Sequence, residues 1–428
     1  MTHPAGDLTA RRRTALGPAY RLFYDSPLHL VHGKGTWVTD VDGRRHLDMY
    51  NNVPHVGHCH PRVVEAIADQ AARLNTHTRY LHDNVVDYAE RLLATLPDAL
   101  SVAMFSCTGS EANELALRVA RSVTGQEGVV VIEHAYHGNS QATYEISTED
   151  VPLERRARRV ATIAAPDVYR GQHRDADAAA RYAAELHTAI ADLKARGVGF
   201  AAFVVDTIAS SSGVVEPPRG YLAAAADVAR EHGGLFIADE VQAGLGRTGS
   251  HFWGFAADAV IPDIVTAGKP LGNGHPLAAT FLKQELVESF ASEAGYFNTF
   301  GGNPVSSAAG LAVLDVIQDE GLQENAERLG TRLRTQLLEL AEQHSIIGDV
   351  RGRGLFLAVD LVIDRDSREP ATAAARQIIN ALRQRGILSS TIGPGANVLK
   401  LRPPMVLSDS DADLFVEQFN AVLCEHSV

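Results

Sequence analysis

Short apolar runs alternate with helical patterns between about residues 60 and 305. Glu111–Ser122 and Gly220–Glu231 repeat their apolar residues with the helical period. Buried strands are predicted for the apolar runs Gly128–Glu133, Ala201–Asp206, Leu235–Ala238, Asp263–Ala267 and Leu277–Leu282. Buried strands that alternate with helices indicate an α/β layer with a mostly parallel sheet. Ligands bind beyond the carboxyl ends of such strands, so the loops that follow them are the first candidates for function.

The pattern changes after Gly302-Asn303-Pro304. The remaining chain predicts a long helical stretch over Ser306–His344, strands within Gly348–Leu361, a helix over Thr372–Arg385, a strand over Val398–Leu401 and a last helix from Asp409. We therefore predict a large α/β domain over 61–305 and a smaller α+β domain over 306–428. The first 60 residues, with a hairpin-like stretch at Gly35–Leu47, are expected to pack with the small domain.

The composition is that of a globular protein, with 45% apolar and 21% charged residues in a chain of 428. No window comes near 18 uncharged apolar residues, and Met1–Gly17 lacks the apolar stretch of a secretory signal. Three widely spaced cysteines argue against a disulfide framework, so we expect a cytoplasmic protein. The net charge of −13 disfavours nucleic acid or an anionic membrane as a partner. A small anionic substrate remains compatible, because it needs only a local pocket of positive charge.

The first candidate site is Thr108-Gly109-Ser110, at the start of a helical pattern. Hydroxyl groups and free backbone N–H groups converge there at the positive end of the helix dipole, which is typical of an anion site, most often for phosphate. The same residues also fit a plain helix start, with Ser110 as the N-cap and Gly109 as a turn. These residues alone leave both interpretations open.

Two further candidates follow predicted strands. Asp239 ends a buried strand, where a carboxylate can hold a proton on a ring nitrogen or cap the following helix. Lys269 lies in a Gly/Pro-rich loop among small and apolar neighbours, and partial desolvation there would lower the pKa of its amine towards that of a nucleophile. Only five lysines occur in the chain, which favours a special role for this one. A phosphate cradle, a ring-nitrogen acid and a desolvated lysine are together the parts of a pyridoxal phosphate site.

The order and spacing of these motifs resemble the class III aminotransferase family, which has the aspartate-aminotransferase-like fold. The matching stretches are Ser106–Arg121, His134–Gly138, Ile237–Gly249, Thr266–Gly274 and Asn298–Pro304. The resemblance implies that the 61–305 domain binds pyridoxal phosphate. The residues it implies around the cofactor are Gly109 and Ser110 at the phosphate with Thr108 beside them, Asp239 at the pyridine nitrogen, and Lys269 in covalent attachment to the aldehyde.

Four other contacts come from the same resemblance. Tyr136 and Val241 would lie against the two faces of the ring, and Gln242 would reach the ring hydroxyl. Thr299 would reach the phosphate bound by a neighbouring subunit, which implies a homodimer with sites at the interface; pairing of dimers into a tetramer also fits. By themselves, Tyr136 and Val241 fit ordinary core packing, and Thr299 fits a loop cap.

The chain departs from the family pattern in two ways that concern the substrate. Members that act on amino acids generally carry an arginine three residues before a Pro-Pro pair, and Lys400 stands at that position, with Arg402 two residues later. A lysine is a point charge without the planar fork that grips a carboxylate. Ser211 replaces an acid that faces this arginine in several aminotransferases. Both changes disfavour alternation between two carboxylate substrates, although relaxed specificity in an amine aminotransferase also fits.

Further stretches resemble the ethanolamine-phosphate phospho-lyase branch of the family, which also carries a lysine at the position of Lys400. They are Asn51–Pro61, Asn75–Asn84, Tyr296–Ile317, Ile347–Phe356 and Asn397–Met405. This resemblance implies a lyase that eliminates phosphate from a small phosphorylated amine, most simply phosphoethanolamine, to give acetaldehyde, ammonia and phosphate. The alternative is an omega-aminotransferase that moves an amine to a keto acid.

The candidates for holding the substrate phosphate are Lys400, Arg79, Asn51 and Ser211 with its neighbouring serines. Arg79 fits a surface position equally well. The nearby histidines are interpreted as turn and packing residues rather than metal ligands, because no carboxylate or thiolate pattern completes a site beyond Cys59; they are His55, His58 and His60.

Overall fold

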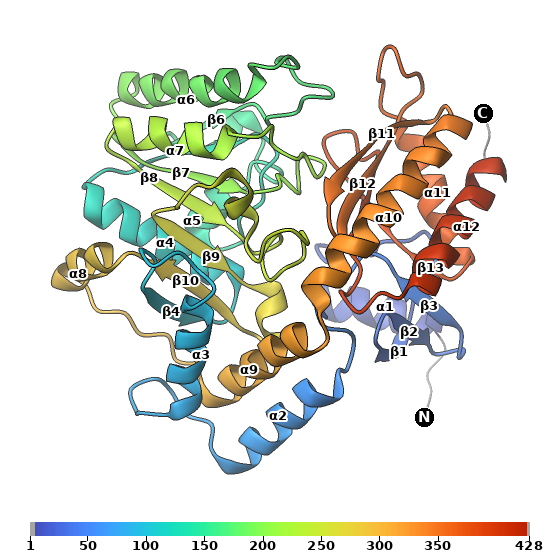
Figure 1. The fold of residues 1–428 in the computed structure, drawn as a ribbon, viewed down its shortest axis with the longest axis horizontal. Helices are drawn as coiled ribbons and strands as arrows, with labels where there is room; N and C mark the ends of the chain where they lie inside the picture. Colours follow the sequence, from blue (N-terminus) through green and yellow to red (C-terminus); the bar gives the residue numbers. More distant parts are fainter. Residues whose placement is uncertain (1–4, 426–428) are drawn as a thin grey trace.

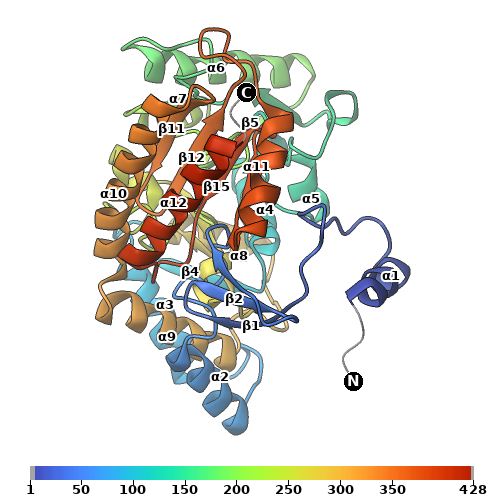
Figure 2. The same cartoon turned by 90° about the vertical axis from the view of Figure 1, so that its right-hand side faces the viewer.

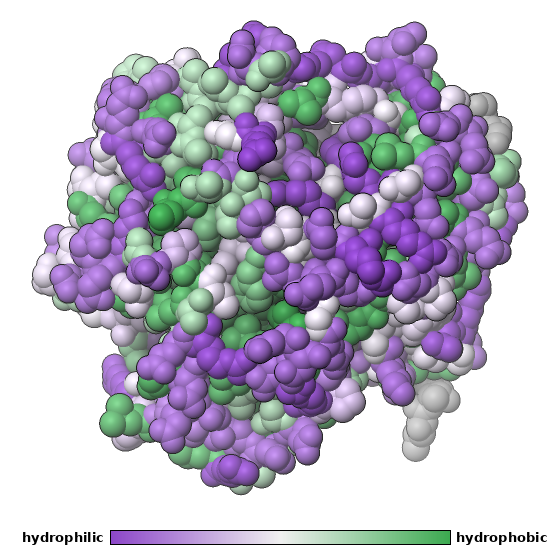
Figure 3. All heavy atoms as spheres, in the orientation of Figure 1, coloured by the Kyte–Doolittle hydropathy of each residue, from purple (hydrophilic) through white to green (hydrophobic). Residues whose placement is uncertain are grey.

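A computed structural model describes residues 5–425 of the chain (Figure 1). The larger body, on the left of Figure 1, holds a sheet with helices on both faces, and the smaller body on the right holds a second sheet with helices packed on it. Hydrophilic residues cover most of the face shown in Figure 3, and hydrophobic residues appear there in small patches. Within residues 5–425, no helix has both the length and the apolar content needed to span a bilayer.

The central sheet of the larger body has seven strands. In spatial order they are β4 (Val102–Ser106), β10 (Ala278–Leu282), β9 (Ile264–Ala267), β8 (Leu235–Asp239), β7 (Phe200–Asp206), β5 (Gly128–Ile132) and β6 (Val160–Ile163). Only β10 runs antiparallel to its neighbours, so the predicted mostly parallel sheet is confirmed. The sequence pattern missed β4 and β6, because each is short and flanked by polar residues.

Helices cover both faces of this sheet. One face packs on α4 (Gly109–Thr124) and α8 (Gln284–Glu293), next to α5 (Gln141–Glu145). The other face packs on α6 (Ala178–Ala195) and α7 (Tyr221–Glu231). Alternate residues of each strand enter the two cores, as Val204 and Val205 of β7 do. Because both faces of the sheet are buried, the sequences of these strands are continuous runs of apolar residues.

Three further helices lie along the lower edge of the larger body in Figure 1. They are α2 (Pro61–Arg73), α3 (Asp83–Leu93) and α9 (Pro304–Asp319), and α2 and α3 both pack on α9. The predicted helical stretch over Ser306–His344 is two helices, because Gly321 takes a left-handed conformation (φ +58°) between α9 and α10 (Leu322–Gln343). Short 3₁₀ turns occur at η1 (Leu153–Arg155), η2 (Gly254–Asp258) and η3 (Lys269–Gly272).

Two four-stranded sheets complete the fold. The first is antiparallel, in the order β11 (Ile347–Arg353), β12 (Phe356–Leu361), β15 (Val398–Leu401) and β14 (Ser390–Ile392), and packs with α10, α11 (Thr372–Gln384) and α12 (Asp409–Glu425). The second has the order β1 (Leu30–Lys34), β2 (Trp37–Asp40), β3 (Arg45–Asp48) and β13 (Ile387–Leu388). β3 pairs in parallel with β13, and this pairing joins the start of the chain to its last quarter.

The positions of the two domain boundaries, after residues 60 and 305, remain predictions from the sequence.

The first helix, α1 (Ala5–Leu16), stands away from the rest of the molecule (Figure 2). The segment that connects α1 to β1 exposes large apolar side chains, among them Tyr20 and Phe23. Exposed side chains of this kind have not reached a core within the single chain.

Candidate active site

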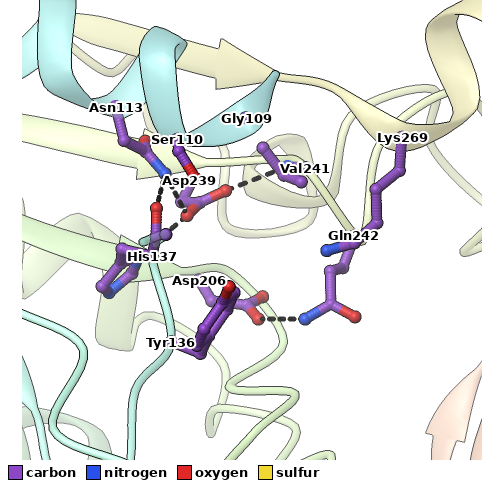
Figure 4. Close-up of a pocket in the computed structure, with 11 residues that line it drawn as sticks. Gly109, Ser110, Asn113, Tyr136, His137, Asp206, Asp239, Val241, Gln242 and Lys269 are labelled. Atoms are coloured by element: carbon purple, nitrogen blue, oxygen red, sulfur yellow. Dashed lines mark hydrogen bonds and ion pairs between the residues drawn. The ribbon is translucent and has the colours of Figure 1, made fainter. Parts of the chain in front are cut away.

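A cavity of about 140 Å³ lies at the carboxyl ends of the parallel strands (Figure 4). Asp206 and Asp239 are the last residues of β7 and β8, and Lys269 follows β9 by two residues. The cavity is lined by Gly109, Ser110, Asn113, Tyr136, His137, Gly138, Asp206, Asp239, Val241, Gln242 and Lys269. Most of these residues stand at strand ends or in the segments that follow strands, which is the location that the parallel sheet predicts.

The amino end of α4 forms one wall of the cavity. Thr108 is the N-cap: its Oγ1 accepts a hydrogen bond from Glu111 N (3.2 Å), and Glu111 Oε2 accepts one from Thr108 N (2.9 Å). Ser110 is therefore not the cap; its Oγ donates to Asn139 Oδ1 and accepts from Asn139 N, both at 3.1 Å. The backbone N–H groups of the first turn have no acceptor within the helix, so this wall can receive an anion.

Three glycines bring the backbone close together around this wall. A Cβ atom on Gly138, which has φ +141°, would lie 2.6 Å from Ser110 Oγ. A Cβ on Gly109 would lie 3.0 Å from Val241 Cγ2, and one on Gly268 would lie 3.2 Å from Gly109 N. Side chains at these positions would fill the space at the helix end, so the glycines keep a cradle open for a ligand.

Asp239 lies beside the first turns of α4 (Figure 4) and is only 4% exposed. Its Oδ2 accepts a hydrogen bond from Asn113 Nδ2 (2.9 Å) and lies 2.7 Å from His137 Nδ1, while its Oδ1 accepts from Val241 N (3.0 Å). Asn113 is fixed in turn, because it donates to His137 O (2.8 Å) and accepts from Thr266 Oγ1 (2.6 Å). The carboxylate thus both caps the following turn and faces the cavity in one fixed orientation.

His137 and Asn113 were not identified as site residues from the sequence. Both lie inside the family motifs, and both are polar residues at buried positions, His137 after β5 and Asn113 on the inner face of α4. A polar residue on the apolar face of a predicted helix is the signal that could have identified Asn113.

Lys269 extends toward the cavity from the first position of η3 (Figure 4). Its backbone has φ +34°, which is uncommon for a residue with a side chain. Burial, assisted by the positive charge of Arg402, lowers the pKa of Lys269 to about 8. The amine therefore loses its proton far more readily than an ordinary lysine, and the uncharged form that acts as a nucleophile or a base predominates above about pH 8.

Gln242 connects the cavity to two buried cations behind it. Its Oε1 accepts hydrogen bonds from Lys400 Nζ (3.4 Å) and from Arg402 Nη1, and its Nε2 donates to Asp206 Oδ2 (3.5 Å) and Ser210 Oγ. Lys400 is 4% exposed and Arg402 6%. Among the described residues neither forms a direct ion pair with an acidic side chain, although the charge of Asp206 acts on both. Burial, together with the charges of Arg402 and Lys269, holds the pKa of Lys400 well below its ordinary value.

The other residues predicted for the substrate lie outside this cavity. Arg79 is exposed and its guanidinium lies 4.0 Å from the ring centroid of Phe297, two residues from the exposed Thr299. Asn51 lines a separate cavity of about 360 Å³ beneath the N-terminal segment. Ser211 lines a small cavity that shares Asp206 and Tyr136 with the main one. Of the residues predicted to hold the substrate phosphate, a single chain therefore places only Lys400 and Ser211 near the main cavity.

The three nearby histidines have different partners. His55 Nε2 lies 2.8 Å from Leu245 O, His58 Nε2 lies 2.8 Å from Asp48 Oδ2, and His60 Nε2 lies 3.0 Å from Glu320 Oε1. Burial lowers the pKa of His55 well below its usual value. Their side chains thus point to separate parts of the structure.

Comparison with known proteins defines the class of this protein. Residues 23–423 match the family model for class-III aminotransferases, and the chain belongs to that family. It is 44% identical over 423 residues to a Drosophila melanogaster protein named alanine–glyoxylate aminotransferase 2-like, across 96% of this chain and 86% of that protein. It is 40% identical over 423 residues to ethanolamine-phosphate phospho-lyase homolog 1 of Caenorhabditis elegans, across 95% of this chain and 90% of that protein. The solved structure of a phospholyase from Arthrobacter in complex with phosphoethanolamine is similar, with a TM-score of 0.94 and 45% identity over 98% of this chain and 99% of that chain.

Enzymes of this family use pyridoxal phosphate, and the cavity fits this cofactor. The glycine-lined end of α4 can receive its phosphate, the fixed carboxylate of Asp239 can meet its ring nitrogen, and the Lys269 amine can meet its aldehyde. When bound, the cofactor supplies an electron sink for charge that develops on the substrate carbon next to nitrogen.

Proposed function

We propose that this enzyme is a lyase that eliminates phosphate from an O-phosphorylated amino alcohol, with phosphoethanolamine as the simplest substrate. The observation that carries the proposal is the pair Lys400 and Arg402, two buried cations beside the cofactor cavity whose shared acceptor is the neutral amide of Gln242. Buried positive charge that lacks a directly bonded carboxylate is costly, and a phosphate dianion supplies two negative charges in addition to that of the nearby Asp206. The similarity to the worm phospho-lyase homolog and to the Arthrobacter phospholyase, whose structure contains phosphoethanolamine, supports the same reaction.

We assign the cofactor contacts as follows. Gly109 and Ser110 hold the cofactor phosphate at the end of α4, and Thr108 shapes that end as its cap. Asp239 holds a proton on the pyridine nitrogen, with His137 and Asn113 behind it. The remaining contacts to the cofactor are the ring faces at Tyr136 and Val241, the ring hydroxyl at Gln242 and the covalent attachment at Lys269.

With the cofactor bound, the substrate amine would take the place of Lys269, and the Lys269 amine would then be available as a base. With a pKa of about 8, its amine accepts the proton from the carbon that bears nitrogen. The C–O bond on the adjacent carbon then breaks, and phosphate leaves with the bonding electrons toward Lys400. The Lys269 amine would then take back its place, which would free the substrate nitrogen as an enamine. Water would hydrolyse the enamine to acetaldehyde and ammonia, so that one phosphoethanolamine and one water give acetaldehyde, ammonia and phosphate.

An amine:keto-acid aminotransferase is the second candidate, and the name of the Drosophila relative favours it. It would use the same Lys269 and Asp239. It differs in needing a keto acid to complete each cycle and in needing no site for a leaving phosphate. An aminotransferase would not need Lys400 and Arg402 to hold a leaving phosphate.

The test is an assay of phosphate and ammonia release from phosphoethanolamine with no keto acid present. We expect equal amounts of both products over many turnovers. Ethanolamine, which lacks the phosphate, is the matched control substrate and should release no ammonia. Turnover that depends strictly on added pyruvate or glyoxylate would contradict the proposal and support the aminotransferase.

We further propose that two copies assemble into a homodimer through the surface around Arg79 and Thr299. This surface exposes large apolar side chains: Leu81 is fully exposed, and Tyr80, Phe297 and Phe300 are also exposed. A second copy would bury them. Thr299 would then reach the cofactor phosphate of the neighbouring subunit, and Arg79, stacked on Phe297 beside it, would supply a cation to the substrate phosphate there.

A further inference from the structure

Gln242 is oriented by groups on both of its sides. Its amide oxygen faces Lys400 Nζ at 3.4 Å and Arg402 Nη1. Its amide nitrogen faces Ser210 Oγ and Asp206 Oδ2, the latter at 3.5 Å, as Figure 4 shows for Asp206. An amide has one accepting end and one donating end. Two basic side chains on one side, and the Ser210 hydroxyl with the Asp206 carboxylate on the other, therefore leave a single favourable orientation, with the N–H₂ group on the Asp206 side, which lines the cavity.

Arg402 is itself fixed by the N-terminal part of the chain. Its Nε donates to Tyr50 O at 3.1 Å, its backbone N donates to Met49 O at 2.9 Å, and its guanidinium lies 4.8 Å from the centroid of the Tyr50 ring. Met49 and Tyr50 directly follow β3. The guanidinium is thus an anchored donor, and its position does not depend on Gln242.

Arg402 does not line the main cavity, whereas Gln242 does. Any effect of Arg402 on the cofactor through hydrogen bonds must therefore pass through the Gln242 amide. Arg402 also carries a charge that acts on Lys269 directly, lowering the pKa of that amine. Replacing Gln242 removes the effect that passes through the amide and leaves the direct effect of the Arg402 charge on Lys269, so the two effects can be measured separately.

We propose that Arg402 is a positioning residue for the cofactor: with Lys400, it holds the amide oxygen of Gln242 and thereby directs the amide N–H₂ group at the ring hydroxyl oxygen. The opposite amide orientation would bring an acceptor against the oxygen that the cofactor presents in its ionised form. Lys400 has two N–H donors and Arg402 three beyond those that meet Gln242 and Tyr50, so both residues can still bind a substrate phosphate. The inference rests on the cofactor site alone and holds for a lyase or an aminotransferase.

The experiment is a double-mutant cycle on cofactor binding. Apoenzymes of the wild type, Arg402→Met, Gln242→Leu and the double variant are titrated with pyridoxal phosphate. We expect each single substitution to weaken binding about tenfold, the size of one charge-assisted hydrogen bond. Because both substitutions remove the same contact, the double variant should be weakened by clearly less than the product of the two single factors. The loss that Arg402→Met still causes in the Gln242→Leu background is the direct effect of its charge on Lys269. Arg328→Met, which removes an exposed arginine paired with Asp409, is the matched control and should bind as the wild type does.

Two further measurements separate positioning from a purely structural role. The pH midpoint of the visible absorbance of the holoenzyme should rise in Arg402→Met, because a donor to the ring oxygen and a nearby positive charge are both lost. Thermal unfolding of each apoenzyme shows whether the variants fold, and Arg402→Lys replaces the methionine variant in the cycle if that one does not. The proposal is overturned if the double variant is weakened by the product of the two single factors. It is equally overturned if the arginine variants leave both cofactor affinity and the absorbance midpoint unchanged.

Discussion

His137 Nδ1 lies 2.7 Å from Asp239 Oδ2, and both side chains are buried at the end of the central sheet. With Asn113, His137 completes the set of donors that keeps the carboxylate aimed into the cavity. No partner for His137 Nε2 is found within residues 5–425, so the ring serves Asp239 through its other nitrogen alone. The proton that Asp239 is proposed to hold on the cofactor ring therefore depends on two residues that never touch the substrate.

We predict that His137→Ala lowers kcat by roughly one order of magnitude, because removing a hydrogen bond to a buried charged group costs about 1.5–3 kcal/mol. The affinity for pyridoxal phosphate should fall as well, whereas KM for the substrate should change little. Steady-state kinetics and a cofactor titration measure the two effects. An unchanged kcat with full cofactor occupancy would show that the histidine is only a packing residue.

Lys269→Ala should abolish the visible absorbance of the covalently attached cofactor together with activity, because no other amine is found among the residues that line the cavity. The variant should still bind the cofactor non-covalently through the end of α4 and Asp239. Absorbance spectra after gel filtration measure covalent attachment, and circular dichroism is the folding control. Retention of the absorbance band would mean that a different lysine carries the cofactor.

The lowered pKa of Lys269 predicts how cofactor capture depends on pH. Only the uncharged amine attacks the aldehyde, so the rate at which apoenzyme attaches pyridoxal phosphate should rise with pH through about 8 and level off above it. In Arg402→Met the same rise should occur at higher pH, since a neighbouring positive charge that favours the uncharged amine is gone. Stopped-flow absorbance at several pH values tests both statements. A rate that does not change between pH 6 and 9 would contradict the assignment.

Lys400 is predicted to determine the preference for a phosphate group. Lys400→Met should raise KM for phosphoethanolamine about a hundredfold, within the 2–5 kcal/mol range measured when one partner of a buried charge pair is removed. Inhibition by inorganic phosphate should weaken in parallel, and covalent cofactor attachment should stay. Lys400→Arg keeps the charge and offers the fork that suits a carboxylate, so it should recover part of the lost affinity. Equal effects of the methionine variant on phosphoethanolamine and on ethanolamine analogues without phosphate would exclude this role.

The dimer proposal predicts complementation between subunits. Co-expression of Lys269→Ala with Arg79→Ala should give mixed dimers in which one site has both an intact lysine and the partner's intact arginine. Such mixtures should recover activity that neither variant shows alone, up to about one quarter of the wild type for random pairing with one intact site per mixed dimer. Light scattering gives the assembly, including any pairing of dimers into a tetramer. No recovery in proven mixed dimers would place Arg79 at its own site or at none.

Much of the fold could be predicted from the sequence because burial on both faces makes the central strands continuously apolar. The ends of β7 and β8 were predicted within a residue or so, and they position Asp206 and Asp239. The break at Gly321 was missed, since both flanking segments continue the helical period. β13 has only two residues, and its pairing with β3 joins distant parts of the chain, so no local pattern indicates it.

The candidate site was predicted where a motif carries its own chemistry, as at Ser110 and Lys269. The site residues that were not predicted are those whose role depends on a neighbour in the folded structure. His137 gains its importance only from Asp239, about a hundred residues away in the chain, and Arg402 only from Gln242. Arg79 is not among the residues that line the cavity of its own chain, and a role toward a second copy would leave no signal in the fold of one.

The most direct test of the central claim is a phosphorus NMR time course of the holoenzyme with phosphoethanolamine and no other substrate. The account predicts steady conversion of the phosphomonoester signal to inorganic phosphate for many turnovers per active site, with acetaldehyde and ammonia formed in equal amounts. If the phosphomonoester signal persists, and the amino group is instead transferred once per active site until a keto acid is added, the lyase assignment is wrong.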